Sequence, residues 1–116
     1  MNPSMISICL DLSLSKLAVN DVQGAISVLN KALSVNPDFA DAYYNRGNCY
    51  FQIQKYAEAI NDYSKAIALN PKNDRAICNR GVAKSVLGDM KTACNDFKLS
   101  AEMGNQMASQ YLAKCK

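Results

Sequence analysis

The most reactive side chains in this sequence are five cysteines, no two of which lie within fifteen residues of each other. They are Cys9, Cys49, Cys78, Cys94 and Cys115. This spacing offers neither a Cys-x-x-Cys redox pair nor a zinc knuckle. The sequence also contains no histidine, which excludes a histidine-activated nucleophile and a histidine-ligated metal. We therefore predict that the cysteines are buried small hydrophobic residues, and that no metal or cofactor is bound.

Two aspartates, Asp62 and Asp96, are the next candidates for chemistry, because each has a polar neighbour in the chain. Both lie in segments with helical periodicity, and Lys65 and Lys98 are close by on the same segments. That arrangement is typical of surface ion pairs rather than of an acid–base pair. The sequence has no phosphate-binding loop and no nucleophile elbow. We predict that the protein is not an enzyme.

The composition indicates one soluble domain. A chain of 116 residues is long enough for a single core, so residues 1–116 are taken as one unit. A net charge of +3 without a basic run does not favour nucleic-acid binding. No segment reaches the ~20 apolar residues of a membrane span, so we expect no membrane partner.

The cysteines and the first residues bear on the compartment. An odd number of scattered thiols favours a reducing compartment over a secreted disulfide framework. The apolar stretch at 5–14 is not preceded by Lys or Arg and is interrupted by polar residues, so it lacks the layout of a signal peptide. We expect the cytoplasm, or the periplasm if an upstream signal has been removed.

An internal repeat organises the chain. A shift of 34 residues aligns Asn36-Pro37 with Asn70-Pro71, and Asn45-Arg46-Gly47 with Asn79-Arg80-Gly81. Within each block, apolar residues recur at helical spacing in two stretches. Because proline cannot continue a helix, Pro37 and Pro71 separate one helical hairpin from the next.

Small residues recur where the two helices of a hairpin would cross. Close helix approach needs small side chains on both helices, with a larger side chain beside them. The small residues of the first helices are Ser13, Gly47 and Gly81, those of the second helices are Ala25, Ala59 and Ala93, and the larger side chains are Leu29, Tyr63 and Phe97.

These features resemble the tetratricopeptide repeat, in blocks 6–39, 40–73 and 74–107. The resemblance implies an all-α fold, a right-handed α-solenoid of three helix-turn-helix hairpins closed by a capping helix at 108–116. The third block lacks the final proline, and Gly104 can serve as its left-handed helix cap. The segment Ala101–Leu112 also resembles the end of a Sel1-like repeat. The pentatricopeptide repeat is disfavoured because its period is 35 residues.

The first predicted helix carries conflicting signals. Apolar and polar residues alternate over 6–15, which alone would predict a strand, whereas the repeat register requires a helix. As a helix it would leave Ile6, Leu10, Leu14 and Leu17 without a place in the hairpin. A missing upstream repeat, a self-association face and one wall of a hydrophobic groove are three competing explanations.

The resemblance also implies where a ligand would bind, since the first helices of such hairpins line the concave wall. Amides there could hold the main chain of an extended peptide or partner helix, with aromatic rings beside it. The predicted peptide-binding residues are Leu10, Leu14, Leu17, Asp41, Tyr44, Asn45, Asn48, Phe51, Arg75, Asn79 and Val82. Ser7, Gln52, Cys78 and Val86 share this wall.

Alternatives remain open for these residues. Tyr44 and Phe51 could instead pack between neighbouring hairpins. Arg46 and Arg80 precede the small glycine, where an ion pair or carbonyl contact between repeats is the better interpretation. A structural role is the alternative function, in which Ile6 and the leucines after it drive homo-oligomerisation or dock onto a longer array.

Chaperone-binding members of this family grip a C-terminal carboxylate with a clamp of Lys, Asn and Arg. Asn45 fits the clamp asparagine and Arg75 could replace a lysine. Asn79, however, occupies the arginine position, and Leu10 and Leu14 occupy the first-helix Lys and Asn positions. Because asparagine cannot make the charge-assisted bidentate contact of arginine, binding of chaperone tails is not expected.

Overall fold

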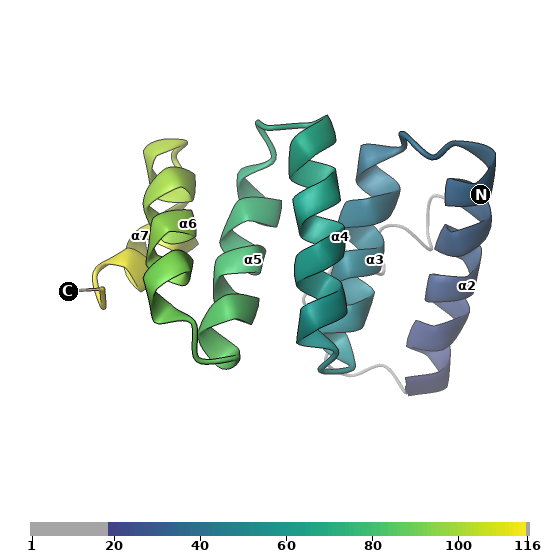
Figure 1. The fold of residues 1–116 in the computed structure, drawn as a ribbon, viewed down its shortest axis with the longest axis horizontal. Helices are drawn as coiled ribbons and strands as arrows, with labels where there is room; N and C mark the ends of the chain where they lie inside the picture. The colour runs from purple at the N-terminus through teal and green to yellow at the C-terminus, as the bar shows by residue number, and fades with distance from the viewer. Residues whose placement is uncertain (1–18, 116) are drawn as a thin grey trace.

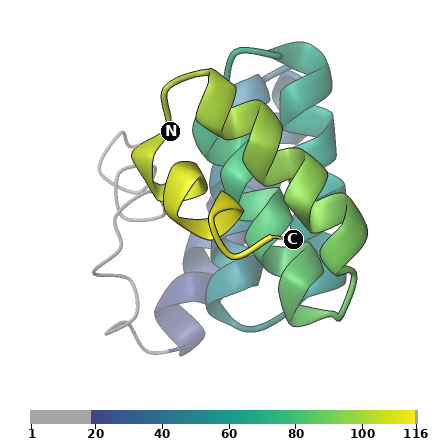
Figure 2. The same ribbon diagram turned by 90° about the vertical axis from the view of Figure 1, so that its left-hand side faces the viewer.

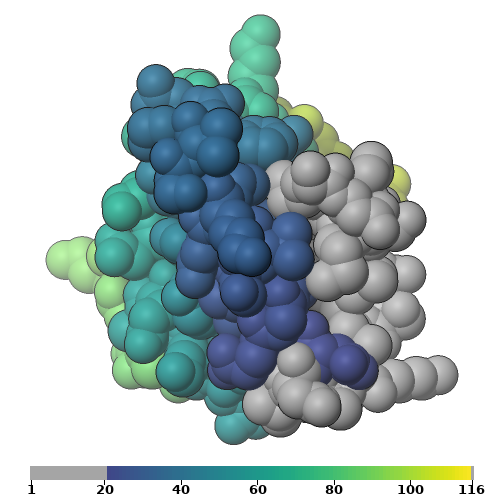
Figure 3. Space-filling view, turned by 90° about the vertical axis from the view of Figure 1, so that its right-hand side faces the viewer, coloured from purple at the N-terminus to yellow at the C-terminus, as the bar shows by residue number. Residues whose placement is uncertain are grey.

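The computed structural model describes residues 19–115, and that part of the chain is all-helical. The helices are α2 (Val19–Val35), α3 (Ala40–Gln52), α4 (Tyr56–Leu69), α5 (Asp74–Val86), α6 (Met90–Glu102) and α7 (Gln106–Leu112). Each helix packs on the next one in sequence, and α3 also contacts α5 (Figure 1). At one end of this array, α2 presents its outer surface (Figure 3). The predicted all-α solenoid is confirmed.

The two helices of each complete hairpin approach closely at a glycine. A Cβ atom added to Gly47 would lie 2.8 Å from the ring of Tyr63, and one added to Gly81 would lie 2.7 Å from the ring of Phe97. Real Cβ atoms are not found so close to another heavy atom, so neither site accepts a larger residue without a shift. The predicted large side chain beside each glycine is confirmed in the hairpins α3–α4 and α5–α6, whereas the facing of Gly47 by Ala59 and of Gly81 by Ala93 stays a prediction.

Three helices end with a residue in the left-handed region of the backbone. These residues are Gln54 (φ 64°), Gly88 (φ 92°) and Gly104 (φ 97°). After each of them the next amide donates to a carbonyl five residues back, as Lys55 does to Tyr50. Gly104 is thus the left-handed cap that the sequence predicts. Gln54, in contrast, has a Cβ atom, and a positive φ is sterically unfavourable for such a residue.

We expect Gln54→Gly to raise the free energy of unfolding by about 0.5–1 kcal/mol, because glycine adopts a positive φ without steric cost. Gly88 occupies the equivalent turn of the next repeat, 34 residues later, and no atom would contact a Cβ atom added there. Gly88→Gln is therefore the matched reverse variant. The free energy of unfolding of the Gly88→Gln variant should fall by a similar amount. Urea unfolding of both variants measures the difference, and equal midpoints for the two would contradict it.

The helix α7 closes the far end of the array, as a cap. Its Ala108 is fully buried, and the ring of Tyr111 stacks on Phe97 with centroids 5.0 Å apart. Leu112 packs against the same cluster. The cap begins at Gln106, earlier than the predicted residue 108, because Asn105 accepts a hydrogen bond from the Ala108 amide and so starts the helix.

The cysteines depart from prediction. Cys94 and Cys115 form a disulfide with their Cα atoms 6.0 Å apart, and Cys49 is also disulfide-bonded. The prediction of buried, unlinked cysteines is therefore wrong for these residues. It fails because helices bring together residues that are distant in sequence, which spacing alone does not reveal. Cys78 is a buried free thiol, as predicted.

Several predictions fall outside the described residues. They concern Ile6, Ser7, Cys9, Leu10, Ser13, Leu14 and Leu17, together with the choice between strand and helix over 6–15. Self-association through the apolar members of this set stays a prediction. Within residues 19–115, no helix is long and apolar enough to cross a membrane.

Candidate functional site

The helices α3 and α5 carry the predicted groove residues that the structure describes. Asp41 and Arg75 are exposed and occupy equivalent positions, 34 residues apart, in the first turns of the two helices. Phe51 and Val82 are half-buried. Because α3 and α5 contact each other, these side chains lie on two neighbouring helices.

Tyr44 lies between hairpins rather than on an open surface. It is buried in a cluster with residues of α4 and with Ala76 of α5, and its ring centroid is 6.0 Å from that of Tyr63. Burial raises the pKa of the Tyr44 hydroxyl. In this structure the alternative interpretation of Tyr44, packing between neighbouring hairpins, describes its contacts.

Asn45 is the most unusual predicted residue. Its exposed fraction is 0%, and neither its Nδ2 nor its Oδ1 atom has a hydrogen-bond partner among the described residues. An unsatisfied buried polar group costs roughly 1–3 kcal/mol, and an amide has two such atoms. A fold that needed only packing at this position would be more stable with an apolar side chain, so Asn45 is a candidate for a functional group.

Asn48 and Asn79 are hydrogen-bonded to each other across two hairpins. The Asn48 Oδ1 atom accepts from the Tyr63 hydroxyl at 2.6 Å and from Asn79 Nδ2 at 3.1 Å. These contacts join α3, α4 and α5 at one atom. Burial raises the pKa of the Tyr63 hydroxyl well above its ordinary value, so it remains a donor. The two amides therefore connect α3 to α5. Asn79 is uncharged, so it supplies no cation at the position where a carboxylate clamp has arginine.

A repeated ion-pair network, which we call the arginine ladder, consists of Asn30, Arg46 and Asp62 and of Ser64, Arg80 and Asp96. In its first rung, Arg46 Nε and Nη2 donate to the two carboxylate oxygens of Asp62, both at 2.8 Å. Arg46 Nη1 donates to Asn30 Oδ1 at 2.9 Å, so the guanidinium joins α2, α3 and α4. The hydrogen bond to Asp62 raises the pKa of Arg46.

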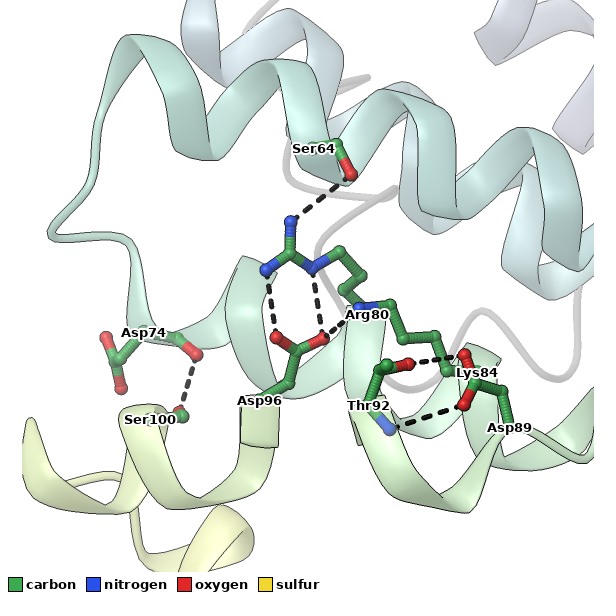
Figure 4. A network of polar contacts seen from close by, with 8 residues as sticks. All are labelled: Ser64, Asp74, Arg80, Lys84, Asp89, Thr92, Asp96 and Ser100. Atoms are coloured by element: carbon green, nitrogen blue, oxygen red, sulfur yellow. Dashed lines mark hydrogen bonds and ion pairs between the residues drawn. The ribbon is translucent and has the colours of Figure 1, made fainter. Parts of the chain in front are cut away.

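The second rung repeats this geometry one hairpin later (Figure 4). Arg80 Nε and Nη2 donate to Asp96 at 3.0 and 2.8 Å, and Arg80 Nη1 donates to Ser64 Oγ at 3.3 Å. Lys84 adds an ion pair to Asp96 at 3.1 Å. Nearby, the Ser100 hydroxyl donates to the Asp74 carbonyl at 2.7 Å and joins α6 to the start of α5.

The ladder confirms that Arg46 and Arg80 form ion pairs, but these pairs lie within one hairpin, whereas the prediction placed them between repeats. The contacts between repeats are the hydrogen bonds to Asn30 and Ser64. The ladder also corrects the partners predicted for the aspartates. Asp62 and Asp96 are 3% and 5% exposed, so they do not form surface pairs with Lys65 and Lys98. Both carboxylates face the first helix of their own hairpin, and the guanidinium there makes two hydrogen bonds at once.

Family models match much of the chain. Residues 40–73 match the model described as tetratricopeptide repeat, and residues 17–54 match one described as TPR repeat. The predicted Sel1-like character of Ala101–Leu112 stays a prediction. The chain has no significant match among curated proteins.

Solved structures share the fold. The second TPR domain of human RPAP3, in complex with the HSP70 peptide SGPTIEEVD, is 31% identical, with 82% of this chain and 81% of that chain covered and a TM-score of 0.76. The first TPR of Spaghetti (RPAP3), bound to the HSP90 peptide SRMEEVD, is 29% identical over 82% and 77% of the chains, with a TM-score of 0.77. The type III secretion translocator chaperone SycD of Yersinia enterocolitica, 16% identical over 97% and 81% of the chains, has a TM-score of 0.80 and shows likeness of fold alone.

Proposed function

Because the chain belongs to the tetratricopeptide repeat family, we propose that it is a non-catalytic interaction module that binds an extended peptide or partner helix along α3 and α5. Two similar structures are complexes of such domains with short peptides, which supports a peptide ligand. The aspartates that could have done acid–base chemistry are held in the arginine ladder, which supports a binding rather than a catalytic role.

The buried amide of Asn45 is the observation that carries this proposal. A peptide main chain offers a carbonyl and an N–H, the two groups that an asparagine side chain can pair with. Because both polar atoms of Asn45 are shielded from solvent, the ligand reaches them only when the side chains that cover them move aside. Asp41 and Arg75, exposed on the same helices, could contact charged side chains of the ligand, and Phe51 an apolar one. Leu10, Leu14 and Leu17 would extend this surface on the first helix.

The chemistry of the peptide differs from that of an acidic chaperone tail. Arg75 is an exposed cation at one clamp position, but Asn79 at the arginine position is tied to Asn48. A terminal carboxylate would therefore lack its bidentate partner. Asp41 adds an exposed negative charge at the equivalent position of the preceding repeat. We propose a ligand bound through its main chain, with side chains of both charges, rather than one ending in several carboxylates.

We expect Asn45→Leu to weaken peptide binding by about 10-fold or more while raising the free energy of unfolding by about 1 kcal/mol, because it removes two unsatisfied polar atoms from a buried site. A peptide is first selected from a random library against the wild-type protein. Calorimetry then gives its affinity for each variant, and urea unfolding gives the stability.

Asn61→Leu is the matched control, because Asn61 is exposed on α4 and should change neither quantity much. An Asn45→Leu protein that binds the peptide as tightly as the wild type would refute a role for the amide. In that case Asp41→Ala with Arg75→Ala tests whether the surface is used at all, since both side chains are exposed and their loss leaves the core intact.

The disulfide bears on the proposed compartment. The expectation of cytoplasm rests partly on unlinked thiols, and this argument no longer holds for Cys94 and Cys115. Disulfides persist in oxidising compartments and are rare in the cytosol. The bridge therefore supports an oxidising compartment such as the periplasm as the proposed location.

A further inference from the structure

The capping helix α7 is too short to be stable alone. It has seven residues, whereas isolated helices need roughly 12–15 residues even to be marginal in water. Its attachments lie at both ends and on one face: Asn105 donates to the Asp74 carboxylate at 2.8 Å, Tyr111 stacks on Phe97, and Cys115 is bonded to Cys94. Figure 2 shows α7 at the end of the array, beside α6.

The helix α7 covers an apolar face that recurs inside the array. The buried cluster at this end contains Cys78, Ala93, Phe97 and Ala108. The equivalent face of α4, with Tyr63, is covered by Ala76 of α5 in the same way. Thus α7 stands where the first helix of another hairpin would pack. Cys78, in the same cluster, is 1% exposed, and burial raises the pKa of its thiol to about 11.

The bridge that anchors α7 can be reached from solvent. Cys94 and Cys115 are half-buried, and both line a surface hollow. The other residues of this hollow are Met90, Lys91, Asn95 and Lys114. Lys91 and Lys114 line the same hollow as the two cysteines, and positive charge around a sulfur favours its thiolate, which makes it a better leaving group in exchange.

We propose that the Cys94–Cys115 disulfide is a redox-controlled lock on the C-terminal cap, and that its reduction by a dithiol releases α7 and uncovers the face around Phe97. One thiolate of the dithiol attacks a bridge sulfur, which breaks the bond between the cysteines and gives a mixed disulfide. The second thiol of the reductant then displaces the protein sulfur. The dithiol becomes a disulfide, and both cysteines end as thiols.

The expected size of the effect follows from chain entropy. The bridge spans 21 residues, and closing a loop of that length shifts an equilibrium by roughly 200- to 300-fold. Without the bridge, docking of α7 depends on one stacked ring, one buried alanine and the contacts of Asn105 and Leu112. The population with α7 undocked should therefore rise by a comparable factor.

Cys78 is a built-in reporter for this opening, because it belongs to the same buried cluster as Ala108 of α7. The full chain is prepared oxidised, as wild type and as Cys94→Ser with Cys115→Ser, and is treated with a maleimide. Peptide mass mapping then gives the labelling rate at Cys78. We expect at least a ~10-fold faster rate in the double variant, nearly unchanged by low urea, as is typical of local opening.

Hydrogen exchange on the same samples locates the opening. Amides of α7 should lose protection in the double variant while those of α3 and α4 keep it. Asp62→Asn is the matched control, since it weakens the middle of the array and leaves the bridge intact. Equal Cys78 labelling in the wild type and the double variant, or loss of protection spread evenly over all the helices, would overturn the proposal.

Discussion

Tyr63→Ala is expected to lower the free energy of unfolding by about 3–5 kcal/mol, which is the usual cost of removing a large buried aromatic side chain. The ring of Tyr63 is fully buried, fills the space beside Gly47 and packs on Tyr44. The substitution would leave a cavity between the two helices of the middle hairpin. It would also remove the hydroxyl that donates to Asn48.

Tyr63→Phe separates these two contributions. It keeps the ring and removes only the hydroxyl, so it should lower the free energy of unfolding by about 0.5–1.5 kcal/mol, the net contribution of one hydrogen bond. Urea unfolding followed by circular dichroism measures both variants. An alanine variant that loses no more than the phenylalanine variant would show that the ring does not hold the hairpin together.

Asp96→Ala is expected to lower the free energy of unfolding by about 3 kcal/mol, because two positively charged side chains in a mostly buried site lose the carboxylate that both of them contact. Arg80 makes two hydrogen bonds to this carboxylate, and Lys84 makes an ion pair with it. Without the carboxylate, the two positive charges would repel each other across one helical turn.

The control is Asp38→Ala, since Asp38 is exposed in the turn between α2 and α3. A surface substitution of this kind changes stability by less than about 0.5 kcal/mol. Thermal unfolding of both proteins gives the comparison. If they melt within a degree or two of each other, the ladder contributes nothing measurable and the contacts of Arg80 are incidental.

The hairpins could be predicted from sequence because their determinants are local or periodic. A proline ends each of the first two units, and a glycine faces an aromatic ring at the same point of successive repeats, as Gly47 does Tyr63. The partners of the aspartates were predicted wrongly, because that argument used only neighbours on the same helix. Yet Arg46 and Asp62 recur together as Arg80 and Asp96, a signal in the alignment that could have identified the pairs.

The candidate site is harder to predict, because the sequence places a residue on a helix face but does not say what covers it. Tyr44 and Asn45 belong to the first helix as expected, but the structure buries both. Asn48 and Asn79 bond to each other because two hairpins meet there, which depends on the stacking angle. The disulfide joins α6 to the residues that follow α7, beyond the regular repeat.

The arginine ladder bears on how unfolding spreads along the array. Each guanidinium holds the second helix of its own hairpin and that of the preceding one, through Asn30 or Ser64. Such contacts are the nearest-neighbour coupling terms of a one-dimensional array, and they make adjacent units melt together. In the next repeat the equivalent positions are Lys98 and Lys114, both exposed. Cooperativity should therefore be strongest between the hairpins and weakest at α7, where fraying of the array would begin once the Cys94–Cys115 bridge is reduced.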